Sequence, residues 1–431
     1  MKEFDLEQIR RVAGTGNKKT ELARRTTTAN GIFFSAEDRA FSRNIPQTWN
    51  VEIETSTITD QAGSGCCWLF ASLNLLRHRA EKEFDMKDFE LSQTYNYFFD
   101  KLEKSNAFLE RVWLYRKEPI SSRKNGMFSH PQSDGGYFSE AANLIDKYGV
   151  VPKSVMPESE NALRSGNLNR VLNRVLRRGG IKIREINDRE AMKVAKENIL
   201  ADIYRILSIS LGEPPRNFSW SFRDNKKKLR KFSGSPQDFA KKFNMQGIGE
   251  KYVELSDTPT LEYGKIYEDK DAWAMVGEHF PMLNIEIAKL KPLILAQLRE
   301  KEGVPAGIES DRDMAAKNQG VMDPKVFDLD NLFDVDFTIS RKNRMRSRED
   351  IADHEILIVA ADAPHGSARW YKVENSWGKS VGEGGFWAMS SAWADQYLQS
   401  AVIRRDLLTP EIVEALKQEP IALEPWEFYG E

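Results

Sequence analysis

The chain is poor in cysteine and histidine. Its 431 residues include two cysteines, adjacent at positions 66 and 67, and five histidines. Neighbouring cysteines rarely reach disulfide geometry, and secreted proteins often depend on several bridges, so this composition argues against a disulfide-stabilised extracellular protein. The same scarcity leaves no cysteine and histidine spacing typical of a zinc site, and we expect neither a metal nor another cofactor.

The sequence also lacks long apolar runs and an excess of either charge. Its first residues, MKEFDLEQIRR, are charged and contain no apolar signal core, and no later apolar run reaches membrane-spanning length. The net charge of −2 gives no overall field that would attract nucleic acid or a membrane. We therefore expect a cytoplasmic protein with no membrane partner, and its length favours more than one structural unit.

The most informative segment that is present reads QAGSGCCWLF, from Gln61 to Phe70. A glycine-containing turn delivers Cys67 to the start of an apolar run able to form a helix. A thiol at a helix N-terminus meets unpaired N–H groups and the positive end of the helix dipole, which lower a cysteine pKa and favour a nucleophilic thiolate. The segment therefore predicts covalent catalysis by Cys67.

A cysteine nucleophile needs a base, and usually a third group that orients the base. Among the five histidines, His354 opens a β-rich run, where a rigid sheet can hold the ring. Asn375 ends the next β-rich run, and antiparallel pairing would bring its amide oxygen to the imidazole, with Trp377 shielding the bond from water. Gln61, six residues before Cys67, is placed to donate to an oxyanion.

The order Gln61, Cys67, His354 and Asn375 resembles the pattern of papain-like cysteine peptidases. The gap of 287 residues from Cys67 to His354 is about twice the ~130–150 of the short papain enzymes. That excess, together with the absent leader and disulfide cysteines, makes the chain similar to the bleomycin hydrolase and aminopeptidase C branch. Three further stretches support this narrower resemblance: Leu91-Ser92-Gln93, Asp134-Gly135-Gly136 and the C-terminal QEPIAL segment before Trp426.

The resemblance implies an intracellular cysteine aminopeptidase that hydrolyses short peptides by a Cys-His-Asn thiol mechanism, without a cofactor. Carried over to this sequence, Cys67 would be the nucleophile and His354 the general acid and base. Asn375 would orient the imidazole, and Gln61 would donate to the oxyanion.

The resemblance also implies contacts with peptide substrates and with other copies of the chain. Gly135 and Gly136 match a glycine pair that forms a wall of the substrate cleft, where missing side chains let a peptide backbone lie close. Trp377 would border the same cleft, and the terminal carboxylate, here on Glu431, would bind the free amino group of the substrate. Members of the branch assemble as homohexamers around a central channel, with the active sites facing inward.

We expect an α+β fold of the papain-like, two-lobed kind, with a helical lobe, a β-barrel-like lobe and a large helical insertion. The pattern of apolar, charged and turn-forming residues predicts five parts. The first three are an N-terminal arm (1–45), a helical lobe with the nucleophile (46–160) and a mostly helical insertion or oligomerisation region (161–300). The last two are a β-rich lobe with the histidine and asparagine (301–408) and a C-terminal helix and tail toward the active site (409–431).

The sequence departs from the family pattern at three places, and two of them keep a non-catalytic function open. These two are Glu355 and the C-terminal tail, which ends Phe428-Tyr429-Gly430-Glu431 rather than in small apolar residues. Cys66 stands where papains usually have serine, and Glu355 follows His354 where a small residue is commoner. A catalytically impaired binding or scaffold protein with this fold is one alternative. The basic run at 226–231 is usually a solvated face, but it also allows nucleic-acid binding as another alternative.

Overall fold

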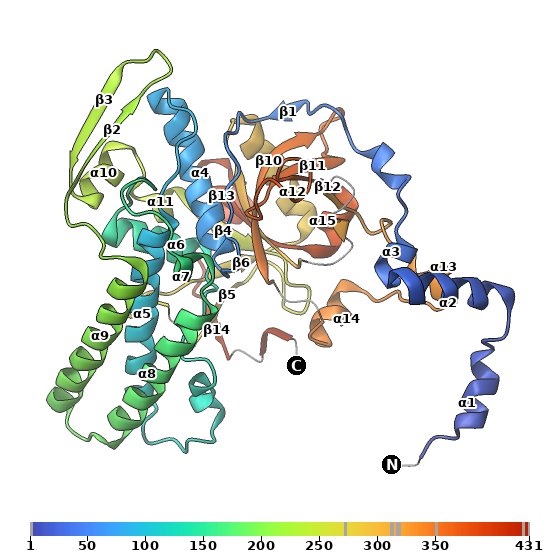
Figure 1. The fold of residues 1–431 in the computed structure, drawn as a ribbon, viewed down its shortest axis with the longest axis horizontal. Coiled ribbons are helices and arrows are strands. Elements are labelled where there is room, and N and C mark those ends of the chain that lie inside the picture. The colour runs from blue at the N-terminus through green and yellow to red at the C-terminus, as the bar shows by residue number, and fades with distance from the viewer. Residues whose placement is uncertain are drawn as a thin grey trace.

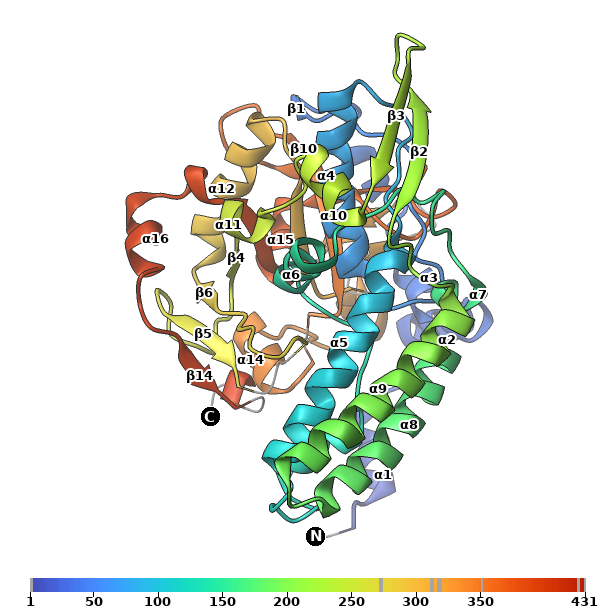
Figure 2. The same ribbon diagram turned by 90° about the vertical axis from the view of Figure 1, so that its left-hand side faces the viewer.

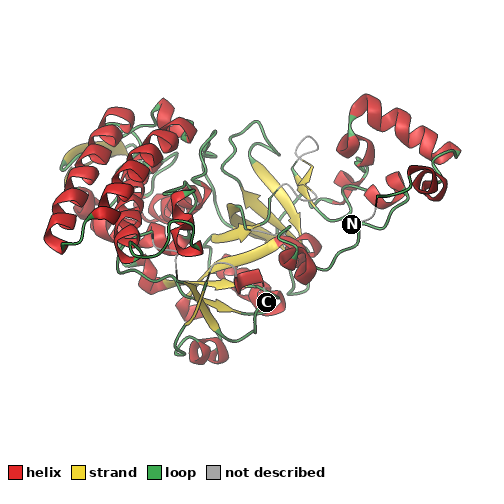
Figure 3. Cartoon of the chain, turned by 90° about the horizontal axis from the view of Figure 1, so that it is seen from below, coloured by secondary structure: helices red, strands yellow, loops and turns green. Residues whose placement is uncertain are grey.

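The computed structural model describes residues 3–270, 274–310, 314–315, 320–349, 352–424 and 427–429. An N-terminal arm, a helical lobe and a sheet-based lobe can be distinguished in Figure 1. The arm contains α1 (Leu6–Ala13), α2 (Lys18–Asn30) and α3 (Ile32–Ala36). It projects away from the two lobes (Figure 3), and it holds more helix than the one weak helix that its sequence indicates.

The helical lobe contains α4 (Cys67–Phe84), α5 (Gln93–Leu114), α6 (Phe138–Tyr148), α7 (Glu160–Leu163), α8 (Gly166–Glu185), α9 (Arg189–Leu211), α10 (Pro236–Lys242) and α11 (Ile248–Lys251). Ser92 starts α5, because its hydroxyl accepts a hydrogen bond from the Tyr95 N–H at 3.1 Å. The helices α5, α8 and α9 lie side by side (Figure 2). In the described part of the chain, no helix is both long enough and apolar enough to cross a membrane.

A two-stranded hairpin of β2 (Phe218–Arg223) and β3 (Leu229–Gly234) extends from this lobe at the top of Figure 1. The basic run 226–231 lies at its turn and in β3. The Asn225 N–H donates to the carbonyl of Asp85, which caps the C-terminus of α4. The basic run is therefore separated from Cys67 by the whole length of α4, about 27 Å at 1.5 Å per residue.

The second lobe is built on one sheet. Its strands are β1 (Val51–Glu52), β4 (Tyr252–Ser256), β5 (Ile266–Asp269), β6 (Met282–Asn284), β7 (Val304–Ile308), β8 (Met314–Ala315), β9 (Val321–Met322), β10 (His354–Asp362), β11 (Trp370–Glu374), β12 (Phe386–Ser390), β13 (Leu398–Arg404) and β14 (Ile421–Leu423). They follow the order β14-β5-β6-β4-β13-β7-β10-β11-β12-β9-β8, and β1 pairs with β10. The helices of this lobe are α12 (Ile287–Arg299), α13 (Leu329–Phe333), α14 (Arg341–Arg346), α15 (Ser391–Tyr397) and α16 (Pro410–Ala415).

Strand β10 is buried along its whole length and separates two hydrophobic cores. Ile356 and Ile358 belong to the core of the sheet lobe, whereas Leu357 and Val359 belong to the core of the helical lobe. Since neighbouring side chains on a strand point to opposite faces, this alternation fixes which residues of β10 meet α4. Burial on both faces also explains why β10 reads as a nearly continuous apolar run.

The structure differs from the sequence expectation near residue 300. Strands β4 to β6 and helix α12 precede that residue, but they belong to the sheet lobe rather than to a helical insertion. These strands are only three to five residues long, which leaves little periodicity to read from the sequence. Pro292 lies inside α12.

Candidate active site

Cys67 opens α4 and is buried, with 8% of its surface exposed. The main-chain N–H of Glu355, the second residue of β10, acts to lower the pKa of the Cys67 thiol. Helix α4 packs against β10. This contact brings the N-terminus of α4 to β10, the strand that His354 starts, although 287 residues of sequence separate Cys67 from His354.

The environment of Cys67 differs from the expectation that the helix N-terminus lowers its pKa. Burial, and after it the carboxyl group of Glu355, raise the pKa of the Cys67 thiol to about 12. The N–H groups of Glu355 and Trp68 act in the opposite direction but do not compensate. The effect of desolvation on the thiol pKa therefore outweighs that of the helix N-terminus. The thiol requires a proton acceptor in order to ionise near neutral pH.

His354 and Asn375 form a direct contact. The distance from His354 Nε2 to Asn375 Oδ1 is 2.8 Å, and the Ser376 N–H also donates to that oxygen at 2.8 Å. The indole of Trp377 stacks on the imidazole, with ring centroids 4.6 Å apart. Antiparallel pairing of β10 with β11 brings these residues together, because Asn375 directly follows β11.

Gln61 connects the loop before Cys67 to the loop that carries Asn375. The Gln61 N–H donates to the Ser376 carbonyl at 2.8 Å, and Gln61 Oε1 accepts a bond from the Ser376 hydroxyl at 2.5 Å. Its Nε2 donates to the Ser64 carbonyl at 2.7 Å. An amide nitrogen carries two hydrogens, so one remains to donate toward a substrate oxygen.

The two glycines expected in the cleft wall have different surroundings. A Cβ on Gly135 would meet no atom within 4 Å, so this position adjoins open space. A Cβ on Gly136 would lie 2.6 Å from both Trp68 Cε2 and Glu140 Oε2. Gly136 is thus required because a side chain at this position would clash with Trp68 and Glu140. Glu431 lies outside the described residues.

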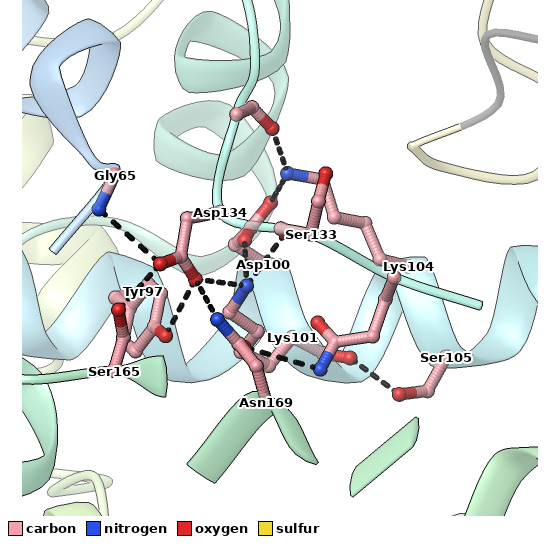
Figure 4. Close-up of polar contacts among 12 residues, drawn as sticks. Gly65, Tyr97, Asp100, Lys101, Lys104, Ser105, Ser133, Asp134, Ser165 and Asn169 are labelled. Carbon is pink, nitrogen blue, oxygen red and sulfur yellow. Dashed lines mark hydrogen bonds and ion pairs between the residues drawn. The ribbon is translucent and has the colours of Figure 1, made fainter. Parts of the chain in front are cut away.

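Asp134 joins the wall loop to the nucleophile loop, as Figure 4 shows. Its carboxylate accepts bonds or ion pairs from Gly65 N (3.2 Å), Tyr97 Oη (2.9 Å), Lys101 Nζ (2.7 Å), Ser165 Oγ (2.5 Å) and Asn169 Nδ2 (2.8 Å). Burial would raise the pKa of this carboxyl, but Lys101 and the hydrogen-bond donors hold it well below its usual range. Asp134 therefore remains ionised and anchors both loops.

A second buried network links α4 to the strand before Asn375. Arg77 Nη2 lies 2.8 Å from Glu374 Oε1, and His78 Nε2 lies 3.2 Å from Glu374 Oε2. The Arg77 and Glu374 side chains are only 2% and 0% exposed. Sequence reasoning assigned no role to this pair or to Asp134. The sequence carries no distinct signal for the pair, because Arg77 stands in the charged second half of α4 and Glu374 ends the half-buried strand β11.

Comparison with known proteins agrees with this geometry. The model of the Peptidase C1-like family matches residues 5–430. The chain belongs to this family. It is 36% identical to aminopeptidase C of Lactobacillus delbrueckii subsp. lactis, over 95% of this chain and 93% of that protein. It is 33% identical to aminopeptidase C of Listeria monocytogenes, over 93% of this chain and 92% of the relative.

A solved structure supports the same assignment. The crystal structure of PepW from Lactobacillus rhamnosis HN001 superimposes with a TM-score of 0.95 and 34% sequence identity, covering 99% of this chain and 98% of that one. The expectations of a papain-like fold and of the bleomycin hydrolase and aminopeptidase C branch are confirmed. The chain is accordingly a cysteine-type peptidase.

Proposed function

We propose that this peptidase is an aminopeptidase that hydrolyses short peptides through a thiol mechanism involving Cys67, His354 and Asn375. The observation that carries the proposal is the 2.8 Å contact between His354 Nε2 and Asn375 Oδ1, beside a cysteine at a helix start. An amide oxygen only accepts hydrogen bonds, so Nε2 must donate to it. The other ring nitrogen, Nδ1, is then the one that can accept the Cys67 proton.

The reaction follows from these positions. The proton of the Cys67 thiol passes to His354, and the thiolate attacks the peptide carbonyl. Gln61 Nε2 and the Cys67 N–H donate to the oxyanion, and His354 returns the proton to the leaving amine. Water then hydrolyses the thioester with His354 as base. Gly135, with open space where a side chain would stand, and Trp377, which covers His354, border the bound peptide.

The preference for a free amino terminus is supported by the names of the relatives, which are aminopeptidases. Amino-acid arylamides with a free α-amine should be hydrolysed with a kcat/KM at least about tenfold higher than their acetylated counterparts, as expected when a buried charged contact is lost. Arylamine release measured spectroscopically compares the two series. Equal rates on both would overturn the exopeptidase proposal while leaving the thiol mechanism intact.

We also propose that the chain assembles into a homo-oligomer. The resemblance to the family implies that this oligomer is a hexamer. The support comes from the arm, in which α1 has no buried residue and Phe4 and Val12 are 76% and 78% exposed. Exposed apolar side chains on a projecting segment mark an interaction surface. Light scattering should give a mass six times that of one chain, and deletion of residues 3–30 should reduce it. A monomeric full-length protein would contradict the proposal.

A further inference from the structure

Three carboxyl groups lie where the two lobes meet, and the peptidase mechanism uses none of them. They belong to Glu140 on α6, Glu254 on β4 and Glu355 on β10. On β10, Glu355 alternates with Ile356 and therefore lies on the face that Leu357 presents to the helical lobe. Its side chain accordingly faces α4 and α6 rather than the interior of the sheet lobe.

The sheet brings Glu254 into the same region. Glu355 is opposite Gly307 on β7, and Gly307 is opposite Ser400 on β13. The Ser400 hydroxyl donates to Glu254 at 2.8 Å, and a Cβ on Gly307 would lie 2.6 Å from that hydroxyl. The missing side chain at Gly307 therefore leaves the room in which the hydroxyl holds Glu254 on this face.

Glu355 has no counter-charge among the described residues. It is 7% exposed, and its Oε1 has no hydrogen-bond partner there. The groups that act on its charge are two further carboxyls, those of Glu254 and Glu140. Glu140 is 4% exposed and lies 3.6 Å from Lys104 Nζ, but that ammonium is closer to Asp100, at 2.7 Å.

This cluster adjoins the reacting sulfur. Two groups of Glu355 act on the pKa of the Cys67 thiol, the main-chain N–H by lowering it and the carboxyl by raising it. Glu140 Oε2 lies directly under Gly136, since a Cβ there would be 2.6 Å from it. The charge of Glu355 thus acts on the reacting sulfur, and the charges of Glu254 and Glu140 act on Glu355.

We propose that Glu355, with Glu254 and Glu140, forms a specificity subsite that binds a cationic group of the substrate, an ammonium or a guanidinium. The inference rests on the proposed peptidase function and adds the substrate class. Buried carboxylates are stable only when they are paired or hydrogen-bonded. Among the described residues Glu355 has no ion-pair partner and its Oε1 accepts no hydrogen bond, and a substrate cation supplies the missing partner.

The subsite has a characteristic pH dependence. Burial, followed by the neighbouring carboxyls, raises the pKa of Glu355 well above its usual range, and burial raises the pKa of Glu140 to about 7. Groups that face the cluster from the surrounding elements are Cys66 and Cys67 on α4, Asp100 and Lys104 on α5, Ser400 on β13 and His354 on β10. A cation binds the ionised carboxyls, so its binding should strengthen as the pH rises through neutrality.

The test compares substrates that differ only in charge. Lysine and arginine arylamides are paired with norleucine and citrulline arylamides, each with a free and with an acetylated α-amine. We expect wild-type enzyme to prefer the charged member of at least one pair, and Glu355→Gln to reduce that ratio of kcat/KM about tenfold or more. If Glu355→Gln loses the preference for lysine or arginine over norleucine or citrulline, the bound cation is the side chain of the substrate. If it loses the preference for a free over an acetylated α-amine, the bound cation is the α-ammonium. The exposed Glu250→Gln is the matched control and should leave both ratios unchanged.

Two outcomes would overturn the subsite. One is a wild-type enzyme that shows no preference for charge, and the other is a Glu355→Gln variant that retains the full ratio. If Glu355→Gln does not fold, Glu254→Gln gives the same comparison. Calorimetric binding of lysinamide and norleucinamide to Cys67→Ala tests the subsite without turnover. Equal affinities there reject it, whereas absence of hydrolysis of every arylamide rejects the peptidase function instead.

Discussion

Replacing Cys67 by alanine should abolish peptide hydrolysis, a loss of roughly 10⁶-fold in kcat when a nucleophile that acts with its base is removed. The same change should remove the thiol that iodoacetamide alkylates at neutral pH. Cys67 is the cysteine whose sulfur meets the first residues of β10, where His354 lies. Arylamide hydrolysis and the mass of the alkylated protein measure the two effects.

The adjacent cysteine provides the control. Cys66 is 4% exposed and packs in the core of the helical lobe. Burial, and after it the charge of Asp134, raise the pKa of the Cys66 thiol. Burial also raises the pKa of Cys67, but only Cys67 has the base that we assign to it, His354, so Cys66 should be inert. Cys66→Ala should keep most of the activity and the alkylation. An inactive Cys66→Ala variant with a normal Cys67→Ala variant would reverse the assignment of the nucleophile.

Replacing Arg77 by alanine should lower the free energy of unfolding by about 3–5 kcal/mol, because it leaves Glu374 buried without its guanidinium partner. Arg77 also donates to the Thr57 carbonyl at 2.7 Å, so the change removes a second contact. Urea unfolding monitored by circular dichroism measures the loss. Since Glu374 directly precedes Asn375, activity should fall together with stability.

The double variant Arg77→Met/Glu374→Met is the control for this prediction. It removes both charges and keeps most of the side-chain volume, so it should lose less stability than Arg77→Ala alone. Although burial would raise the pKa of Glu374, His78 and Arg77 hold that pKa below its usual range. The stabilisation is thus complete above the ordinary glutamate pKa of about 4.3 and is lost as the pH falls through the lowered value. Wild-type stability that does not change over this acidic range would contradict the role of the pair.

Sequence patterns located the secondary structure best where a helix or strand had a long run of periodic or apolar residues. Helix α6 is followed by Gly149, and β10 contains six consecutive apolar residues, Ile356 to Ala361. The short strands β5 and β6 gave no such signal, and their place in the sheet is set by pairing with distant segments. Local periodicity does not encode that pairing.

The sequence by itself determined which residues are candidates for the site, namely Cys67, His354, Asn375 and Gln61, because a nucleophile, a base and amide groups are recognised by residue type and order. Only the tertiary structure decided their environment. Docking of α4 on β10 buries the thiol and reverses its expected pKa shift. Strand pairing brings together Glu355 and Glu254, and α6 adds Glu140. Burial and electrostatics depend on which residues meet across long stretches of chain, and those contacts exist only after folding.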